Sequence, residues 1–232
     1  MADLIGMMLV RNEAGRFLEK VLAQMTAVCS RVYVLDDGSE DDTADICRRY
    51  GAVVEINEIP LWEKNEQQAR QKLWEMATAG AQPDDWILCL DADETIDRVD
   101  GLREFLESVS QQYPDRDGLA FKLYDMWSPT HYRDDRLWSA HNRAWVMAVK
   151  FDSRRSYRWN QRALHCGRFP ANAVTGYVMS PRRIQHWGWS DPEFRRFKYE
   201  RYLRVDPQGI YGSMEQYQSI MDPDPVLVEF EP

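Results

Sequence analysis

The feature that most constrains the fold is an alternation of short apolar runs and amphipathic segments over the first half of the chain. Apolar runs predict strands at residues 4–10, 31–35, 52–56, 86–90 and 118–124. Apolar residues at helical spacing predict helices at residues 14–27, 41–50, 63–79 and 99–112. Strands and helices that alternate in this way form a mostly parallel sheet with helices on both faces. We therefore expect an α/β fold.

The second half of the chain gives weaker signals. Residues 126–143 are rich in Trp, His, Arg and Asp, which is typical of a loop, and residues 144–151 predict a strand. Asp191 and Pro192 predict the start of a helix that runs to about Arg204, because a capping carboxylate precedes a proline at the first helical position. No domain boundary is evident, so we expect a single domain over residues 1–232.

Charge is distributed unevenly along the chain. The formal net charge of −9 at pH 7 disfavours a protein that binds nucleic acid over its whole surface. Residues 1–118 hold 12 basic and 25 acidic side chains, whereas residues 133–204 hold 16 basic and 6 acidic ones. The tail, residues 205–232, has six acids and no base. We expect two faces of opposite sign around one ligand site, with the acidic tail covering the basic face.

Composition narrows the class of protein further. No apolar run approaches the roughly 20 residues of a membrane helix. The run at residues 4–10 follows an acid and does not resemble a signal peptide. Four cysteines lie far apart without a CxxC pair, which favours reduced thiols over disulfides or a zinc site. We expect a cytoplasmic protein, with peripheral attachment to the inner face of the membrane as an alternative.

Acidic side chains follow two of the predicted strands, where ligands of parallel sheets bind. Asp36 and Asp37 follow the strand at residues 31–35, and their carboxylates can accept hydrogen bonds from a nucleobase or a ribose. Gly38 behind them allows close approach of the backbone to a ligand. An ordinary turn that caps the next helix is the alternative, since these residue types are typical of turns.

A second acidic pair, Asp91 and Asp93, follows the strand at residues 86–90 with Ala92 between its members. Two carboxylates at this spacing offer the oxygen ligands that Mg²⁺ and Mn²⁺ prefer. Such an ion could neutralise charge on a leaving diphosphate. The alternative is a solvated loop.

A third polar group, Arg11, Asn12 and Glu13, follows the strand that ends at Val10 and either contacts a base or ribose or begins the next helix. Together, the three strand-end motifs resemble the family 2 glycosyltransferases of GT-A fold, which have a Rossmann-like central sheet. The resemblance covers residues 4 to about 125. The sequence Asp-Ala-Asp-Glu at residues 91–94 is similar to that of bacterial enzymes of lipopolysaccharide-core and related glycan assembly.

The resemblance implies a metal-dependent, inverting glycosyltransferase that uses a nucleotide-diphosphate sugar, with a UDP-sugar favoured and Mn²⁺ or Mg²⁺ as the metal. It implies that Asp37 contacts the base, that Asp36 lies beside it and that Asp91 lies toward the ribose and sugar. A basic donor contact is expected from Lys64 or Arg70. The predicted donor site comprises Val10, Arg11, Asn12, Glu13, Asp36, Asp37, Gly38, Lys64, Arg70, Asp91, Ala92 and Asp93. The predicted metal ligands are Asp93, Asp91 and His186.

The second half, residues 119–204, is expected to bind the acceptor and to supply the general base that inverting transfer needs. Many family members carry this base in a Glu-Asp pair, and no such pair follows Glu94 here. Candidates are Asp135, which is preferred, and Asp134, Asp152, Asp191 and His165. For each acid the alternative is a surface pair with a neighbouring arginine.

Two further features of the second half have open interpretations. His186 precedes a turn and is predicted to bind the metal, with a buried histidine bonded to backbone as the alternative. Residues 191–202 mix basic and aromatic side chains on a helix. They could hold a diphosphate or an anionic acceptor, or they could form an ordinary packing helix.

Three other functions compete with glycosyl transfer to a glycan or other hydroxyl acceptor. A sugar-phosphate nucleotidyltransferase is disfavoured, because residues 10–16 hold one glycine and an acid in place of a glycine-rich basic loop. The missing Glu-Asp pair favours a non-catalytic nucleotide- or glycan-binding module, but the retention of Asp91 and Asp93 speaks against it. Transfer to a modified base of DNA, as in phage-type enzymes, is the remaining alternative, because a local basic stripe suffices for a single strand. Oligomeric state stays open.

Overall fold

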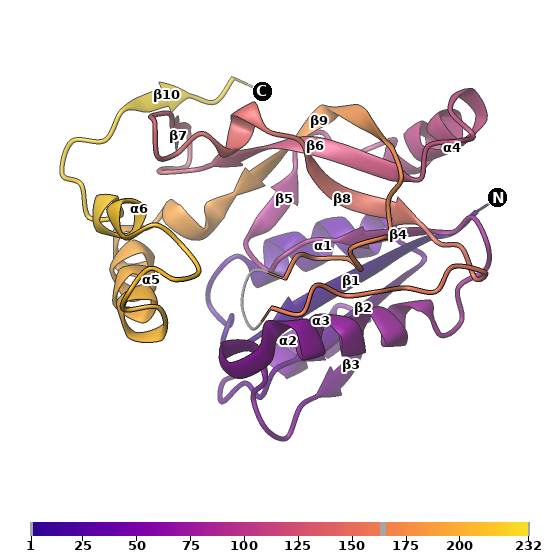
Figure 1. The fold of residues 1–232 in the computed structure, drawn as a ribbon, viewed down its shortest axis with the longest axis horizontal. Helices are drawn as coiled ribbons and strands as arrows, with labels where there is room; N and C mark the ends of the chain where they lie inside the picture. The colour runs from indigo at the N-terminus through magenta and orange to yellow at the C-terminus, as the bar shows by residue number, and fades with distance from the viewer. Residues whose placement is uncertain (1, 163–165, 232) are drawn as a thin grey trace.

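The computed structural model describes residues 2–162 and 166–231, which form an α/β fold around an eight-stranded sheet (Figure 1). In sheet order the strands are β3 (Val53–Ile56), β2 (Arg31–Asp36), β1 (Leu4–Val10), β4 (Trp86–Cys89), β8 (Trp145–Lys150), β6 (Gly118–Asp125), β9 (Tyr177–His186) and β5 (Glu94–Ile96). Within this sheet β8 and β5 run against the other strands. The predicted mostly parallel α/β fold is therefore confirmed.

Helices cover both faces of the sheet. One face packs against α1 (Leu18–Val28), α2 (Thr43–Arg49) and α4 (Leu102–Gln112), and the other packs against α3 (Trp62–Thr78). Alternate residues of β1 serve the two layers: Met8 faces the α1 side, whereas Met7 and Leu9 face the α3 side. Because both faces of β1 are buried, its sequence is an unbroken apolar run.

The second half adds elements that the sequence pattern did not predict. The predicted loop at residues 126–143 contains β7 (His131–Arg133) and the 3-10 turn η1 (Ala140–Asn142). Strand β9 was missed because most of its side chains are half-buried or exposed, so its sequence holds no apolar run. Strand β5 has three residues, which is too short for a periodic signal. The second turn, η2 (Trp187–Trp189), follows β9 directly.

The acidic tail folds back on the second half. It forms α6 (Met214–Ser219) and β10 (Leu227–Glu229), and β10 pairs with β7. Asp222 lies 3.0 Å from Arg133, and Glu215 pairs with Arg136. Two acids of the tail thus pair with arginines of the basic block, and coverage of the whole basic face by the tail stays a prediction.

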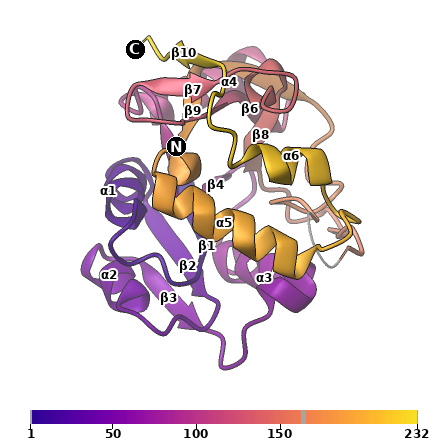
Figure 2. The same ribbon diagram turned by 90° about the vertical axis from the view of Figure 1, so that its left-hand side faces the viewer.

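Helix α5 (Pro192–Val205) begins where the sequence predicted, and the Asp191 carboxylate accepts hydrogen bonds from the backbone N–H groups of Glu193 and Phe194. None of the residues of α5 is buried. In Figure 2 this helix runs across the edge of the sheet at which β1 and β2 end. Among the residues that the structure describes, none of the helices has the length and apolar character needed to cross a bilayer.

Candidate active site

The polar residues predicted at strand ends converge on one edge of the sheet. Strands β1, β2, β4, β6 and β9 run in the same direction, so their carboxyl ends meet there. Asp91 and Asp93 follow β4, and His186 is the last residue of β9. Asp125, the last residue of β6, is the register partner of His186. The edge therefore gathers acids of the first half with groups of the second half.

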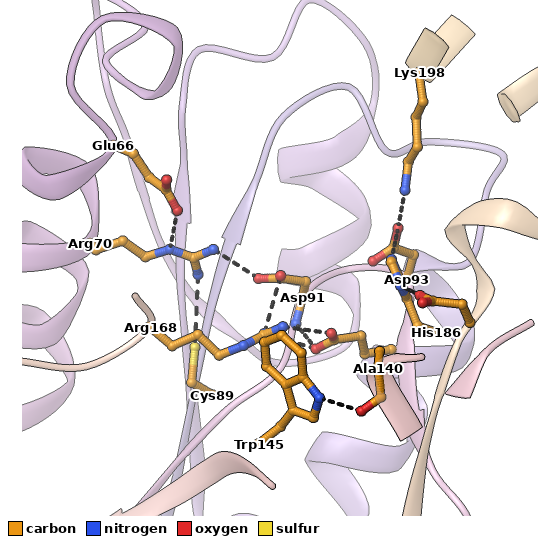
Figure 3. A network of polar contacts seen from close by, with 12 residues as sticks. Glu66, Arg70, Cys89, Asp91, Asp93, Ala140, Trp145, Arg168, His186 and Lys198 are labelled. Atoms are coloured by element: carbon orange, nitrogen blue, oxygen red, sulfur yellow. Dashed lines mark hydrogen bonds and ion pairs between the residues drawn. The ribbon is translucent and has the colours of Figure 1, made fainter. Parts of the chain in front are cut away.

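Asp91 faces two arginines, as Figure 3 shows. Its Oδ1 accepts a hydrogen bond from Arg70 at 3.1 Å, and Arg168 lies 3.1 Å from its Oδ2. Arg168 also donates two hydrogen bonds to Glu94, at 2.6 and 2.8 Å. Burial favours a higher pKa for Asp91, but the guanidiniums of Arg168 and Arg70 outweigh it and lower the pKa. We call this group, Arg70, Asp91, Glu94 and Arg168, the arginine side.

Asp93 faces different partners. Its Oδ2 lies 2.9 Å from Nζ of Lys198 and 3.3 Å from Nε2 of His186. The other ring nitrogen of His186, Nδ1, lies 2.7 Å from Oδ1 of Asp125. We call Asp93, Asp125, His186 and Lys198 the histidine side.

The charges of the histidine side reinforce one another. Burial favours a higher pKa for Asp93, but Lys198 and His186 outweigh it and hold that pKa well below its usual value. Burial likewise disfavours a charged His186, yet the carboxylates of Asp93 and Asp125 raise its pKa to about 10. The ring can then donate an N–H to each carboxylate. As a metal ligand it would release the proton on Nε2.

The histidine side fits a divalent metal in part. Carboxylate and imidazole are suitable ligands, and a metal-binding histidine usually has a carboxylate on its second nitrogen, as Asp125 provides here. Within residues 2–162 and 166–231, no cluster of three or more His, Cys, Asp or Glu side chains could hold a metal. Asp91, predicted as a ligand, faces arginines instead. The pair Asp93 and His186 suits an ion that takes its other ligands from phosphate and water.

Asp36 and Asp37 lie at the end of β2, and both are fully buried. Asp37 accepts hydrogen bonds from Asn57 and from the backbone N–H groups of Leu61 and Trp62, at 2.7 to 3.0 Å. It thereby holds the start of α3 rather than that of the next helix, α2 (Thr43–Arg49), and its contact with a base stays a prediction.

The turn after Asp37 also orders Asp36. The Oδ1 atom of Asp36 accepts a hydrogen bond from the backbone N–H of Ser39 at 2.6 Å. Its Oδ2 is buried without a hydrogen-bond partner in the described part of the chain. Gly38 has a φ of 75°, a conformation that side chains disfavour, and a Cβ there would press on Pro60.

Arg11, Asn12 and Glu13 lie beside this turn. The backbone N–H of Asn12 donates to Ser39 Oγ at 2.9 Å, and that of Glu13 donates to Thr43 Oγ1 at 2.7 Å. Burial, with a further contribution from Asp93, raises the pKa of Glu13 to about 7. The group after β1 is thus tied to the motif after β2, as a shared site requires.

The two basic candidates for a donor contact lie in different places. Arg70 reaches Asp91, whereas Lys64 lines a cavity of about 400 Å³ together with Arg11 and Arg204. Three cationic side chains around one cavity suit an anionic ligand. Both residues therefore stay candidates, one near the acidic pair and one near the end of β1.

The structure brings none of the four acidic candidates for the general base, Asp135, Asp134, Asp152 and Asp191, into a described contact with Asp91 or Asp93. Asp135 accepts hydrogen bonds from Arg133, at 2.6 Å, and from backbone N–H groups. Burial favours a higher pKa for Asp135, but these hydrogen bonds outweigh it and lower the pKa, which weakens a base. Asp134 lies 3.2 Å from His141. His165 is outside the described residues.

Sequence reasoning gave no role to three members of the site, Glu94, Asp125 and Arg168. Asp125 directly follows the predicted strand at residues 118–124, so the strand-end rule that selected Asp91 and Asp93 could have found it. Arg168 lies outside the helices and strands, and no spacing pattern linked it to the acidic pair. Lys198 lies in the helix that was predicted to mix basic and aromatic side chains, but its contact with Asp93 was not predicted.

Comparison with known proteins gives a family match for the first half. The model of glycosyl transferase family 2 matches residues 8–115, which contain all three strand-end motifs. This half is therefore similar to family 2 glycosyltransferases, in agreement with the predicted α/β fold and with the predicted enzyme class.

Two curated relatives match most of this chain. They are uncharacterized proteins of Mycobacterium tuberculosis and Mycobacterium bovis, each 29% identical over 211 residues that cover 84% of this chain and 49% of the relative. The chain thus spans about half the length of the curated relatives it matches.

Solved structures show a weaker likeness. The glucosyl-3-phosphoglycerate synthase of Mycobacterium tuberculosis, in complex with Mn²⁺, UDP and glucosyl-3-phosphoglycerate, has a TM-score of 0.39 and 20% identity, and the likeness covers 53% of this chain and 44% of that one. The mannosyl-3-phosphoglycerate synthase of Rubrobacter xylanophilus has the same TM-score and identity, with 54% and 41% covered.

Proposed function

We propose that this glycosyltransferase moves a sugar from a nucleotide-diphosphate sugar to an acceptor hydroxyl, with inversion, and that it uses a divalent ion held by Asp93 and His186. The observation that carries the proposal is the arrangement of Asp93, His186 and Asp125 at the common carboxyl edge of the sheet. Ligands of such sheets bind at this edge.

In this proposal the histidine side prepares a place for the leaving diphosphate. Asp125 holds the His186 ring through Nδ1 and so directs Nε2 toward Asp93. A divalent ion bound there would supply positive charge that stabilises the departing diphosphate. Preorganised charge of this kind is usually the largest single contribution to catalysis.

The rest of the donor would lie toward β1 and α3. The cavity of about 400 Å³ lined by Arg11, Lys64 and Arg204 offers three cations to the phosphates of a nucleotide. On the other side, Arg70 and Arg168 fix the carboxylate of Asp91, which we propose to orient the ribose or sugar. The buried Oδ2 of Asp36 offers an acceptor for a ribose or base donor once the neighbouring turn opens.

The acceptor side is proposed in less detail. Asp135 is retained as the first candidate for the general base, although its contacts with Arg133 lower its pKa. A glycan hydroxyl of the type found in bacterial core assembly is the proposed acceptor, and a nucleobase of DNA is the alternative.

The proposal is tested by thermal unfolding of the chain with UDP, GDP, TDP or CDP, each with and without Mn²⁺. A ligand that binds the folded state raises Tm by mass action, so one nucleotide should raise Tm when Mn²⁺ is present. No shift with any of the four would contradict the central proposal. Asp93→Ala should remove the metal-dependent part of the shift, whereas Asp115→Ala, which removes an exposed acid paired with Arg116, should not.

A measurement of turnover distinguishes an active enzyme from a non-catalytic binding module. Release of sugar from the nucleotide sugar that binds, measured with and without Mn²⁺, is expected for the enzyme. Binding without any release would favour the non-catalytic module.

A further inference from the structure

Two cationic groups of the second half meet at one oxygen of Asp93. Nζ of Lys198 and Nε2 of His186 lie 2.9 and 3.3 Å from Oδ2. Figure 3 shows Lys198 reaching Asp93 from the side away from Arg70. His186 has a proposed role as a metal ligand, but the ammonium of Lys198 has no role in the function proposed above.

The surroundings hold Lys198 in a defined position. Its side chain is only 15% exposed, and Nζ lies 4.4 Å from the centre of the Trp189 ring. A Cβ at position 188 would collide with both Lys198 Nζ and Asp93 Oδ2, so only glycine leaves room for their contact. This is a built contact rather than a chance surface pair.

An ammonium and a divalent ion compete for such an oxygen. Like charges at short range repel strongly where protein groups largely exclude water. A metal bound by Asp93 and His186 would therefore displace Lys198. Lysine suits an exchangeable contact, because its charge is compact and its stem is flexible. Asp91, in contrast, is held by two arginines.

Helix α5, which carries Lys198, also lines the cationic cavity. The helix has no fully buried residue, and its Tyr199 and Tyr202 pack against the small cluster of Trp127, Trp138, Trp189 and Ile220, which is separate from the two clusters that cover the main sheet. Farther along the same helix, Arg204 lines the cavity that also contains Arg11 and Lys64. The diphosphate of a donor in that cavity would extend toward Asp93, within reach of α5.

We propose that Lys198 is the exchangeable counter-cation of Asp93: it leaves Asp93 when a divalent ion binds and pairs instead with the diphosphate of the donor. This inference rests on the proposed function. Displacement of Lys198 weakens binding of the metal alone, and the donor compensates by pairing with the released ammonium. Metal and donor then strengthen each other's binding, and this coupling is reciprocal.

The test measures binding of Mn²⁺ to the whole chain, from the electron paramagnetic resonance signal of free Mn²⁺, with and without UDP. Lys198→Met should bind Mn²⁺ alone about tenfold more tightly than the natural chain, since a charged hydrogen bond no longer has to be broken. UDP should then increase the affinity for Mn²⁺ less than it does in the natural chain. Lys198→Arg, which keeps the charge, should retain the weak binding.

Arg201→Met is the matched control. It removes one positive charge from the same helix, but Arg201 lies over the rings of Trp62 and Tyr202 rather than on Asp93. Its affinity for Mn²⁺ should equal that of the natural chain. Circular dichroism checks that every variant is folded.

The outcomes separate the two proposals. Equal affinity for Mn²⁺ in the natural chain and Lys198→Met, or an equal gain in Lys198→Met and Arg201→Met, overturns the role of Lys198 and leaves the proposed function standing. If neither the natural chain nor Lys198→Met binds Mn²⁺, with or without UDP, the metal of the proposed function is itself refuted and the exchange is refuted with it.

Discussion

Asp91 and Asp93 are two residues apart, yet the structure surrounds them with different kinds of charge. The arginine side holds Asp91 with guanidiniums, which stay charged at any pH a protein meets and form fixed, forked contacts. The histidine side holds Asp93 with an imidazole and an ammonium from β9 and α5. One acid is fixed in place, whereas the other sits among groups that can change partner or proton.

The largest effect on stability is expected from the arginine side. Arg168→Ala would leave Glu94, which is 1% exposed, and Asp91 without a main counter-charge. Breaking a buried pair in this way lowers the free energy of unfolding by about 3–5 kcal/mol. Urea denaturation measures the loss. Arg154→Ala, at an arginine that is 90% exposed, is the control and should leave the urea midpoint unchanged. Similar urea midpoints for Arg168→Ala and Arg154→Ala would show that the arginine side does not stabilise the fold.

The histidine side should instead govern activity. Asp93→Ala is expected to lower kcat by roughly 100- to 1,000-fold, as loss of one preorganised electrostatic group does elsewhere. Its urea midpoint should fall much less than that of Arg168→Ala, because His186 keeps Asp125 as a partner. Sugar transfer from the donor identified by thermal shift provides the measurement. Full metal-dependent activity in Asp93→Ala would show that Asp93 does not take part in catalysis.

A smaller effect is expected from Asp125, which acts through His186. Asp125→Asn keeps the shape of the side chain but weakens the orientation of the ring, and such a change lowers metal affinity about 10–100-fold. Titration of activity with Mn²⁺ should show the shift with little change in kcat at saturating metal. An unchanged Mn²⁺ requirement would mean that His186 does not need Asp125.

The smallest expected effect is a pH dependence of stability at Glu13. Burial, and next the negative charge of Asp93, raise the folded pKa of this acid from 4.5 to about 7. The folded state therefore binds the proton more tightly than the unfolded state. This contribution to stability is complete below pH 4.5 and is lost as pH rises through about 7.

Glu13→Gln should flatten the fall of Tm across that pH range. In the natural chain, Mn²⁺ bound at Asp93 should move the fall of Tm to lower pH. The ion offsets the negative charge of Asp93, which is one cause of the raised pKa of Glu13. The same pH profile in Glu13→Gln and in the natural chain would assign the transition to another group.

Most of the first half of the fold could be predicted because β1, β2 and β4 are largely buried on both faces. Residues 4–10, 32–35 and 86–90 hold continuous apolar runs, and each lies in or over an observed strand. Strand β9 could not be found in this way, since it combines Arg182, Arg183 and Gln185 with few buried positions. Its pairing with β6 is long-range and depends on tertiary packing that no local pattern records.

The candidate site likewise contains contacts that the sequence predicted and contacts that it did not. Asp93 and His186 were predicted together, and the structure brings them within 3.3 Å. Asp91 was expected beside them, but its neighbours come from α3 and from the loop that holds Arg168. Sequence spacing gives the order of the strand ends along the sheet. It does not say which basic side chains fold over each carboxylate.

The lack of buried residues in α5 has a consequence for local unfolding. Helix α1 buries five side chains, so detaching it would expose part of the main hydrophobic core. Detaching α5 would break ion pairs and ring contacts and would uncover only the small cluster against which Tyr199 and Tyr202 pack. Ion pairs near the surface weaken as salt is added. Backbone amides of α5 should therefore exchange with solvent faster than those of α1, and faster still at high ionic strength. Access to the sheet edge would then depend on a local opening equilibrium that leaves the core folded.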